Sequence, residues 1–403
     1  MASDPKVLLV WGQYPRWMPP VQFSSRQVTL AARLKVAPGF KDQGSLNFNY
    51  FSSFEPHGWL EGGGFDLGEY CDRLGLRRDF DFIVVLADQD MGIFPSNVKS
   101  FGCPAILLMG DTHHFARPIS TLIDYVLREG FCAVASQFTA HHLHWFNKAG
   151  VARVGWAPGL MTTNVAQAPA RVRKDATVFV GHTWKYHLYR YELLQLVKAA
   201  RFPIEILTAT REEAAERYAN TLISFNCSLN GDVNIRNYEV LASGGFLLTD
   251  LLHEASGFAT LFRPGEACDC YAGGEDLLSK IDFYRRNPES AIAIALRGQK
   301  LFREQLNAER ALQRFRKYFF EGDDGALLLP PDPRLDEALD PNWRDRLTVY
   351  EDVQELHRRN PSIEVRVDST ASWFVASDLG DLSRVRVVTA SSDKEAGDYA
   401  VTA

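Results

Sequence analysis

Apolar runs of strand length alternate with amphipathic segments along most of this chain. In the first part of the sequence the runs occupy residues 6–11, 81–87, 104–109, 131–135 and 154–156. The segments between them predict helices, including one that is capped by Ser24 or Ser25 and runs to Leu34. Continuous apolar strands separated by helices are typical of a parallel sheet that is covered on both faces.

A second series with the same rhythm follows. Strands are predicted at residues 176–181, 204–207, 222–225 and 246–249, and helices at 189–200, 212–219, 275–286, 288–305 and 311–320. The pattern indicates the α/β class, with two tandem Rossmann-like domains at residues 1–158 and 159–325 that face a cleft. Ligands of such sheets bind outside the carboxyl ends of the strands, so we expect the site in the cleft.

The residue composition and the pattern of apolar positions change after Gly322. Residues 326–403 begin as a linker rich in Leu and Pro and continue as a small α+β extension. The extension is predicted to hold one helix and three short strands, at residues 344–359, 363–367, 373–376 and 385–388. No motif assigns it a role. Docking on a domain, recruitment of a partner and oligomerisation through residues 341–403 are the alternatives.

The amino-acid composition limits the classes of protein to which this chain can belong. The 403 residues are 46% hydrophobic and 23% charged, and the net charge is -6, which is typical of a soluble globular protein and unlike a nucleic-acid binder. No apolar stretch approaches transmembrane length. The six cysteines have neither disulfide-framework nor zinc spacing, so we expect reduced thiols and a cytoplasmic protein, at most peripheral to a membrane. The loop after the first strand lacks a Gly-rich dinucleotide fingerprint, which argues against an NAD or FAD domain.

The most informative stretch is residues 234–250. It predicts a short helix, a turn at Gly244 and Gly245, and a buried strand. Arg236 lies at the N-terminus of the helix, where the helix dipole disfavours a cation unless an anion also binds there. Glu239 follows three residues later on the same face, and its carboxylate suits the two hydroxyls of a ribose. The pair indicates a nucleotide-diphosphate site, with an ordinary ion pair on the helix surface as the alternative.

A second candidate group, Asp111, His113 and His114, directly follows the strand predicted at residues 104–109. Doubly wound folds place reactive side chains at such strand ends, and histidine is suited to proton transfer near neutral pH. We predict that this cluster is catalytic and supplies the general base. The alternative is that Asp111 caps the next helix while the histidines pack or face solvent.

Two further groups are weaker candidates. Asp88 and Asp90 follow another predicted strand, where solvation of a loop or capping of a helix is the more ordinary role. His141, His142 and His144 lie on a predicted helix without the spacing of a standard metal pair, so we expect a surface or core role for them.

Several sequence pieces follow one another in order along residues 178–320. They are Phe179-Val-Gly181 with Tyr189-Arg190, the stretch 234–250, Leu261-Phe-Arg-Pro-Gly-Glu266, Tyr271, residues 275–281, Tyr284, Asn287-Pro288 and Arg297-Gly298. In this order they resemble the C-terminal half of the CgeB-like, group-1-type glycosyltransferases of GT-B architecture. The resemblance covers about a third of the chain. The N-terminal half matches only in its alternation of predicted strands and helices, and the C-terminal extension does not match.

The resemblance implies that the second domain holds a nucleotide-sugar donor and the first domain an acceptor. It implies that Glu239 holds the ribose and that Lys185, Arg190 and Arg236 reach the diphosphate. Three further residues in or beside the matching pieces are assigned to the donor site: Gly181, His182 and Asn237. Gly231 stands where a larger family pattern has the first of two Glu residues, so no stereochemical outcome carries over.

The expected function is transfer of a sugar from a nucleoside-diphosphate sugar of the UDP or GDP type to a glycan, a protein or a small molecule. The resemblance to GT-B enzymes implies that helix dipole and cationic side chains meet the charge of the leaving diphosphate, so no divalent metal, no metal ligand and no other cofactor is expected. Two alternatives remain open. One is a nucleotide-sugar epimerase or hydrolase of the same fold, and the other is a non-catalytic protein of a coat or assembly.

Overall fold

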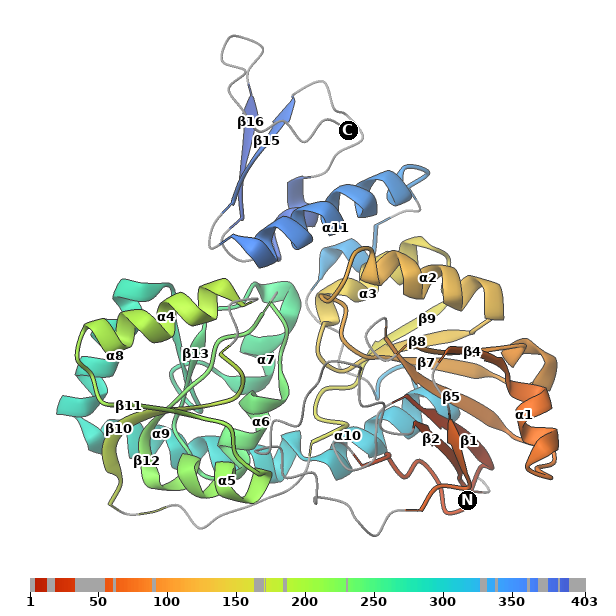
Figure 1. The fold of residues 1–403 in the computed structure, drawn as a ribbon, viewed down its shortest axis with the longest axis horizontal. Coiled ribbons are helices and arrows are strands. Elements are labelled where there is room, and N and C mark those ends of the chain that lie inside the picture. Colours follow the sequence, from red (N-terminus) through yellow and green to blue (C-terminus); the bar gives the residue numbers. More distant parts are fainter. Residues whose placement is uncertain are drawn as a thin grey trace.

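Two parallel sheets form the cores of two domains that lie side by side, with a smaller extension above their junction (Figure 1). The structure is a computed structural model. It describes residues 4–12, 19–32, 55–60, 63–88, 92–162, 170, 172–183, 187–229, 231–326, 332–337, 340–360, 363–368, 376–382 and 385–390. The predicted α/β class with two Rossmann-like domains is confirmed.

The first sheet has seven parallel strands in the order β3-β2-β1-β5-β7-β8-β9. Its strands are β1 Val7–Trp11, β2 Val28–Ala32, β3 Gly58–Leu60, β5 Phe82–Ala87, β7 Ala105–Met109, β8 Ala133–Ser136 and β9 Arg153–Trp156. All five side chains of β1 are buried, because both faces of the sheet are covered. A separate parallel pair joins β4 Gly63–Asp66 to β6 Ile93–Ser96. The helices are α1 Leu67–Arg73, α2 Pro118–Glu129 and α3 Leu143–Lys148, with 3₁₀ turns at Val98–Phe101 and Ala140–His142.

The helix predicted from Ser24 or Ser25 to Leu34 is wrong. Within its described part the chain turns at Ser25 and continues as β2, a strand beside β1 whose Leu9 pairs with Thr29. The apolar run Val28–Ala32 is buried almost throughout, and β-branched residues pack well in such a strand. The serines that suggested a helix cap belong to the turn that precedes it.

The second sheet has five parallel strands in the order β11-β10-β12-β13-β14. The strands are β10 Lys174–Val180, β11 Ile204–Leu207, β12 Thr221–Phe225, β13 Leu247–Asp250 and β14 Asp269–Tyr271. The helices are α4 Leu188–Ala199, α5 Arg211–Asn220, α6 Ile235–Ala242, α7 Phe258–Phe262, α8 Gly274–Arg286, α9 Pro288–Leu301 and α10 Ala308–Phe315, with a 3₁₀ turn at Glu254–Ser256 and π-helical turns at Phe302–Leu306 and Arg316–Phe320.

The chain crosses between the domains twice, and the two crossings touch. The first follows β9, and the second lies between α9 and α10, which Figure 1 shows returning to the side of the first sheet. A Cβ on Gly159 would lie 2.6 Å from the carbonyl oxygen of Leu306. Beyond the second crossing, the ring of Phe315 lies 4.7 Å from that of Phe23, and the Tyr318 hydroxyl donates to the Val154 carbonyl at 2.8 Å. The end of the second domain is therefore packed into the core of the first.

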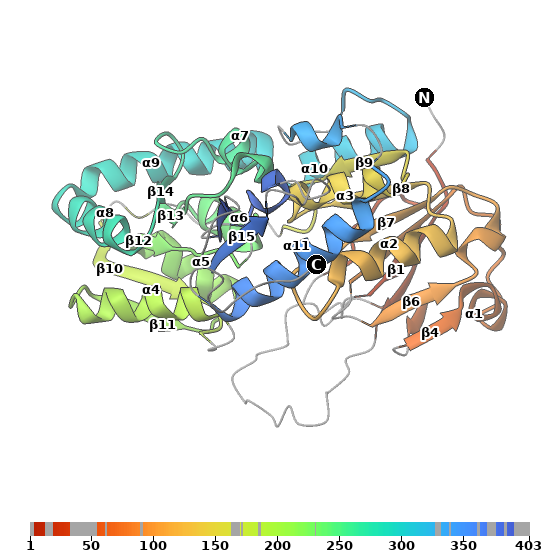
Figure 2. The ribbon, with the colours of Figure 1, turned by 90° about the horizontal axis from the view of Figure 1, so that it is seen from above.

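The extension consists of helix α11 Trp343–Arg359, the parallel strands β15 Ile363–Asp368 and β16 Val385–Ala390, and 3₁₀ turns at Pro333–Leu335 and Ala376–Leu379. Figures 1 and 2 show α11 lying across the junction of the two domains, with one end over α2. Of the third predicted strand, residues 373–375 lie outside the described part, and Ala376 begins a 3₁₀ turn. None of the described helices combines the length and the apolarity needed to cross a membrane.

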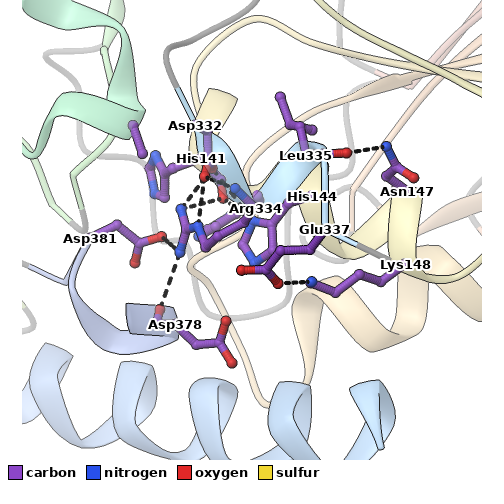
Figure 3. Close-up of polar contacts among 12 residues, drawn as sticks. His141, His144, Asn147, Lys148, Asp332, Arg334, Leu335, Glu337, Asp378 and Asp381 are labelled. Atoms are coloured by element: carbon purple, nitrogen blue, oxygen red, sulfur yellow. Dashed lines mark hydrogen bonds and ion pairs between the residues drawn. The ribbon is translucent and has the colours of Figure 1, made fainter. Parts of the chain in front are cut away.

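A buried ion network fixes the extension to the first domain (Figure 3). The Arg334 guanidinium donates to both carboxylate oxygens of Asp332 at 2.8 Å and lies 2.9 Å from Asp381 Oδ2. It also reaches the carbonyl of His141 on the first domain at 3.4 Å. All three charged side chains are at most 4% exposed. Lys148 of α3 adds a contact to Glu337.

Candidate functional site

A cavity of about 300 Å³ lies between the two sheets, at the carboxyl ends of their strands. From the side of the seven-stranded sheet it is lined by Asp88, Gly110, Asp111, His113, His114, Phe138 and Met161. From the side of the five-stranded sheet it is lined by His187, Arg190, Leu229, Asp232, Asn234, Ile235, Arg236 and Glu239. The cavity thus brings together the predicted catalytic cluster with three of the predicted donor residues, Arg190, Arg236 and Glu239.

Helix α6 presents its N-terminus to the cavity, as the sequence predicted. Asn234 precedes it with extended backbone angles but forms no side-chain capping hydrogen bond. The helix ends in a Schellman motif, in which Gly244 has a φ of 72° and donates to Leu241 O while Gly245 donates to Val240 O. The uncapped first turn leaves backbone N–H groups available to an anion.

The Arg236 guanidinium lies flat against the end of β10. Its Nε donates to the Val180 carbonyl at 2.9 Å, its Nη1 donates to Asn226 Oδ1 at 2.6 Å, and its Cζ lies 4.5 Å from the centre of the Phe179 ring. Gly181 makes this placement available, because a Cβ there would lie 2.4 Å from Arg236 Nη2 and the glycine φ is +147°. The hydrogen bonds of the guanidinium go to neutral groups, and its charge acts on the Glu239 carboxyl group of the same helix.

Arg190 lies beside Arg236 and is also held by neutral groups. Its Nε and Nη2 donate to the Cys227 carbonyl at 3.2 and 2.7 Å, and its Cζ lies 5.6 Å from the centre of the Phe179 ring. Burial and the neighbouring charge of Arg236 lower the pKa of Arg190. Within the described residues neither guanidinium forms an ion pair with a carboxylate. Two guanidiniums at a helix N-terminus, with no described carboxylate in ion-pair contact, favour a site for a multiply charged anion.

Glu239 lies one helical turn further along α6 on the cavity wall. Burial raises the pKa of its carboxyl group, while Arg211 and Arg236 act in the opposite sense. No hydrogen bond from another described residue holds its carboxylate. Within the described residues Arg236 and Glu239 form no ion pair, so the alternative of an ordinary pair on the helix surface is not supported.

The opposite wall carries the predicted catalytic cluster on the loop after β7. His113 is buried, and His114 Nε2 lies 3.7 Å from Asp111 Oδ2. Asp88, at the end of β5, accepts a hydrogen bond from the backbone N of Asp111 at 3.1 Å. A Cβ on Gly110 would lie 2.2 Å from Asp88 Oδ2, so only glycine fits there. Asp88 is thus a support of the loop.

Asp111, His113 and His114 bring their ligand atoms within 4.8 Å of one another, a spacing that one divalent ion could bridge. The expectation of no divalent metal and no metal ligand was made for the whole site, and it stays a prediction.

His187 is a titratable cavity residue that was not predicted from the sequence. It precedes α4, and its ring lies 6.4 Å from that of His114 on the opposite wall. Burial, followed by the charge of Arg190, lowers the pKa of His187 to about 3, so its imidazole is neutral near pH 7. Its position three residues before Arg190, at the start of a donor-side helix, is the signal that could have found it.

Other predicted residues do not line the cavity. Asn237 is buried and its Oδ1 accepts from Asn226 Nδ2 at 2.8 Å, so it supports the strand ends instead. Gly181 lies behind Arg236 and His182 is exposed. Lys185 and Asp90 lie outside the described residues. His141, His142 and His144 are fully buried, so of the surface or core role expected for them the structure shows the core role.

Comparison with known proteins agrees with this arrangement. Residues 165–317 match a sequence family described as glycosyl transferase-like. Sucrose-phosphate synthase from Thermosynechococcus elongatus has a similar structure, with a TM-score of 0.54 at 10% identity over 78% of this chain and 98% of that one. Anabaena HepE in complex with UDP gives 0.54 at 10% identity over 78% and 99%. A glycosyltransferase from Rickettsia africae gives 0.51 at 9% identity over 79% and 98%. This is the GT-B fold.

The fold and the domain match are those of a glycosyltransferase enzyme. The matched residues largely coincide with residues 178–320, which carried the resemblance. The finer assignment to CgeB-like proteins stays a prediction, and no curated sequence matches the chain. In this GT-B chain the cavity lies where the two strand-end surfaces meet, which is where the sequence reading expected it.

Proposed function

We propose that this GT-B protein transfers a sugar from a UDP- or GDP-sugar to an acceptor hydroxyl or similar nucleophile. The observation that carries the proposal is the pair Arg190 and Arg236. Both guanidiniums lie on the cavity wall at the N-terminus of α6 and lack a carboxylate partner within the described residues. Such a pair suits the two phosphates of the donor.

Cleavage of the sugar–phosphate bond places negative charge on the departing diphosphate. Fixed donors aimed at such developing charge stabilise the transition state by about 2.7–4 kcal/mol each where one has been removed. Arg190, Arg236 and the free N–H groups of α6 supply several donors of this kind. We therefore propose that the leaving group departs without a bound divalent ion.

Glu239 is proposed to accept hydrogen bonds from the ribose hydroxyls. Its carboxylate lies on the same wall as Arg236 and is not held by another described side chain. On the opposite wall, Asp111, His113 and His114 are proposed to face the acceptor. One of them would remove the acceptor proton as the bond to the sugar forms.

Titration calorimetry with UDP, GDP and ADP tests the donor site. The wild-type chain is expected to bind UDP or GDP, and Arg236→Ala and Glu239→Ala are expected to weaken that affinity by about 10-fold or more, the loss of a charged hydrogen bond. Arg217→Ala is the matched control, because Arg217 lies on α5 of the same domain, 55% exposed and away from the cavity. Wild-type affinity in both Arg236→Ala and Glu239→Ala would refute the proposed donor site.

A nucleotide-sugar epimerase or hydrolase is the second candidate. Acidic and histidine side chains lie on both walls, with Asp111 and His114 on one side and Asp232 and His187 on the other. That arrangement suits a reaction in which groups close on the sugar from both domains. Consumption of UDP-glucose at an unchanged rate without any acceptor would favour this second candidate over transfer.

A further inference from the structure

The loop that carries the predicted catalytic cluster is irregular and needs support from outside its own domain. It joins β7 to α2, and two of its non-glycine residues, Phe115 and Arg117, have left-handed φ values of 64° and 58°. Such backbone angles persist only where the surroundings fix them. Arg117 also occupies the N-cap position of α2 and forms no side-chain capping hydrogen bond.

Helix α11 of the extension supplies the missing cap. Glu351 Oε1 accepts hydrogen bonds from the backbone N of Ile119 at 2.7 Å and of Ser120 at 2.9 Å, and Oε2 accepts from the Ser120 hydroxyl at 2.5 Å. Glu351 is only 3% exposed. A carboxylate at a helix N-terminus satisfies free N–H groups and complements the helix dipole. Here the cap comes from a residue more than 200 positions later in the chain.

Two arginines tie the loop itself to α11. Arg358 Nη1 donates to the backbone carbonyl of His113 at 3.0 Å. In the reverse direction, Arg117 Nη1 donates to the Thr348 carbonyl at 2.6 Å, and its Nη2 lies 2.9 Å from Asp352 Oδ1. The loop is therefore held at His113 and at Arg117, on either side of its left-handed residue Phe115.

A third connection runs through the core. The Tyr350 hydroxyl of α11 lies 2.8 Å from His142 Nε2 and donates to Asp381 Oδ1 at 2.9 Å. His142 Nδ1 lies 2.6 Å from the Thr112 hydroxyl, and Thr112 stands between Asp111 and His113. All the side chains of this chain of bonds are buried. The extension thus contacts the loop through a continuous buried network.

We propose that α11 is a working part of the transferase site, because Tyr350, Glu351 and Arg358 fix the loop that presents Asp111, His113 and His114 to the cavity. The three are positioning residues, since none of them lies on the cavity wall. The inference rests on the proposed function, because that function gives the loop its catalytic role. It assigns the extension to the first domain as an integral support and not as a separate module for a partner.

Arg358→Ala in the full chain tests the proposal, with Arg359→Ala as the matched control. Arg359 is the next residue, 68% exposed, and contacts only Glu355 among the described residues. Amide hydrogen exchange is measured in the peptide covering residues 110–118. Loss of the Arg358 contact is expected to speed exchange there about tenfold, while Arg359→Ala leaves it unchanged.

Measurements of turnover distinguish a positioning role of Arg358 from an effect on the stability of the protein. For the fastest of UDP-glucose, UDP-N-acetylglucosamine and GDP-mannose, Arg358→Ala is expected to lower kcat about 10- to 100-fold, as small misplacements of catalytic groups do. The KM for the donor and the affinity for UDP are expected to stay within about twofold, because the donor wall is untouched. Arg358→Lys is expected to restore part of kcat.

Tyr350→Phe is a second, independent test of the proposal, with Tyr318→Phe as its control. Both hydroxyls are buried and hydrogen-bonded, but the Tyr318 hydroxyl binds Val154 far from the loop. Tyr350→Phe is expected to lower kcat and speed loop exchange, and Tyr318→Phe to do neither.

Unchanged loop exchange and unchanged kcat in both Arg358→Ala and Tyr350→Phe would overturn the proposal. So would a fall in kcat that Arg359→Ala or Tyr318→Phe reproduces. If the wild-type chain binds no UDP or GDP and turns over none of the three donors, the proposed function fails, and the exchange measurement alone then decides whether α11 holds the loop.

Discussion

Acidification is predicted to destabilise this protein through histidines that the fold keeps neutral. Burial, followed by neighbouring His141, holds the pKa of His142 well below its usual value. Burial, followed by the charge of Arg334, does the same for His144. The pKa of His187 is lowered to about 3. Between pH 7.5 and 5.5 the native state therefore stays unprotonated at His187 and binds fewer protons at His142 and His144 than free histidines would.

The unfolded chain behaves differently, because its histidines titrate near a pKa of about 6.5. Below that pH the unfolded state binds more protons than the native state, so the free energy of unfolding falls as the pH falls. Moving from pH 7.5 to 5.5 costs at most about 1.4 kcal/mol for each such histidine, or at most about 4 kcal/mol for the three. This is a large share of the 5–15 kcal/mol that is typical of a native domain.

Urea unfolding followed by tryptophan fluorescence measures this loss, since the ring of buried Trp145 lies 4.4 Å from that of His144. His144→Asn is the diagnostic variant. The Asn amide can keep the hydrogen bond that His144 Nδ1 donates to the His141 carbonyl at 2.7 Å, and it does not titrate.

The variant is expected to lose less stability than the wild-type chain over the same pH range, by up to about 1.4 kcal/mol. Comparing the two slopes removes the opposite contribution of buried carboxyl groups such as Glu351, whose pKa is raised by burial. Parallel stability curves for the two proteins would refute the reasoning.

Three further predictions concern the site and the extension. Gly181→Ala is expected to cost about 1–3 kcal/mol in urea unfolding and to weaken UDP binding in calorimetry, because its Cβ would strike Arg236 at a left-handed φ; unchanged affinity would contradict this. Arg334→Met is expected to cost about 3–5 kcal/mol, because Asp332 and Asp381 stay buried without their cation; a thermal unfolding temperature equal to that of the wild type would count against it. EDTA is expected to leave donor turnover unchanged, and loss of turnover that manganese restores would argue for a metal-assisted leaving group.

Much of the fold could be predicted because parallel strands buried on both faces leave long apolar runs. Strands β5 and β7 occur within one residue of their predicted bounds. The failure at β2 has a local cause, since the short run Val28–Ala32 suits a helix and a strand equally by pattern. The pairing of this run with β1 decides between helix and strand, and such pairing is not visible in the sequence.

The candidate site was predictable where a strand end alone positions a residue. Asp111, directly after β7, follows this rule, whereas Arg236 was predicted from the N-terminus of α6; both line the cavity. Asn237 was misplaced because adjacent helix positions face different sides, and its side chain turns to Asn226. The support of the loop by Glu351 joins residues more than 200 positions apart, so no local pattern could reveal it.

The contact between the two inter-domain crossings has a mechanical consequence. Gly159 on the outgoing chain and Leu306 on the returning chain lie against each other, and a Cβ at position 159 would lie 2.6 Å from the Leu306 carbonyl oxygen. Gly159 also has a φ of +80°, a backbone conformation that residues with a side chain rarely adopt. Any larger residue at position 159 would therefore force the two inter-domain connections apart.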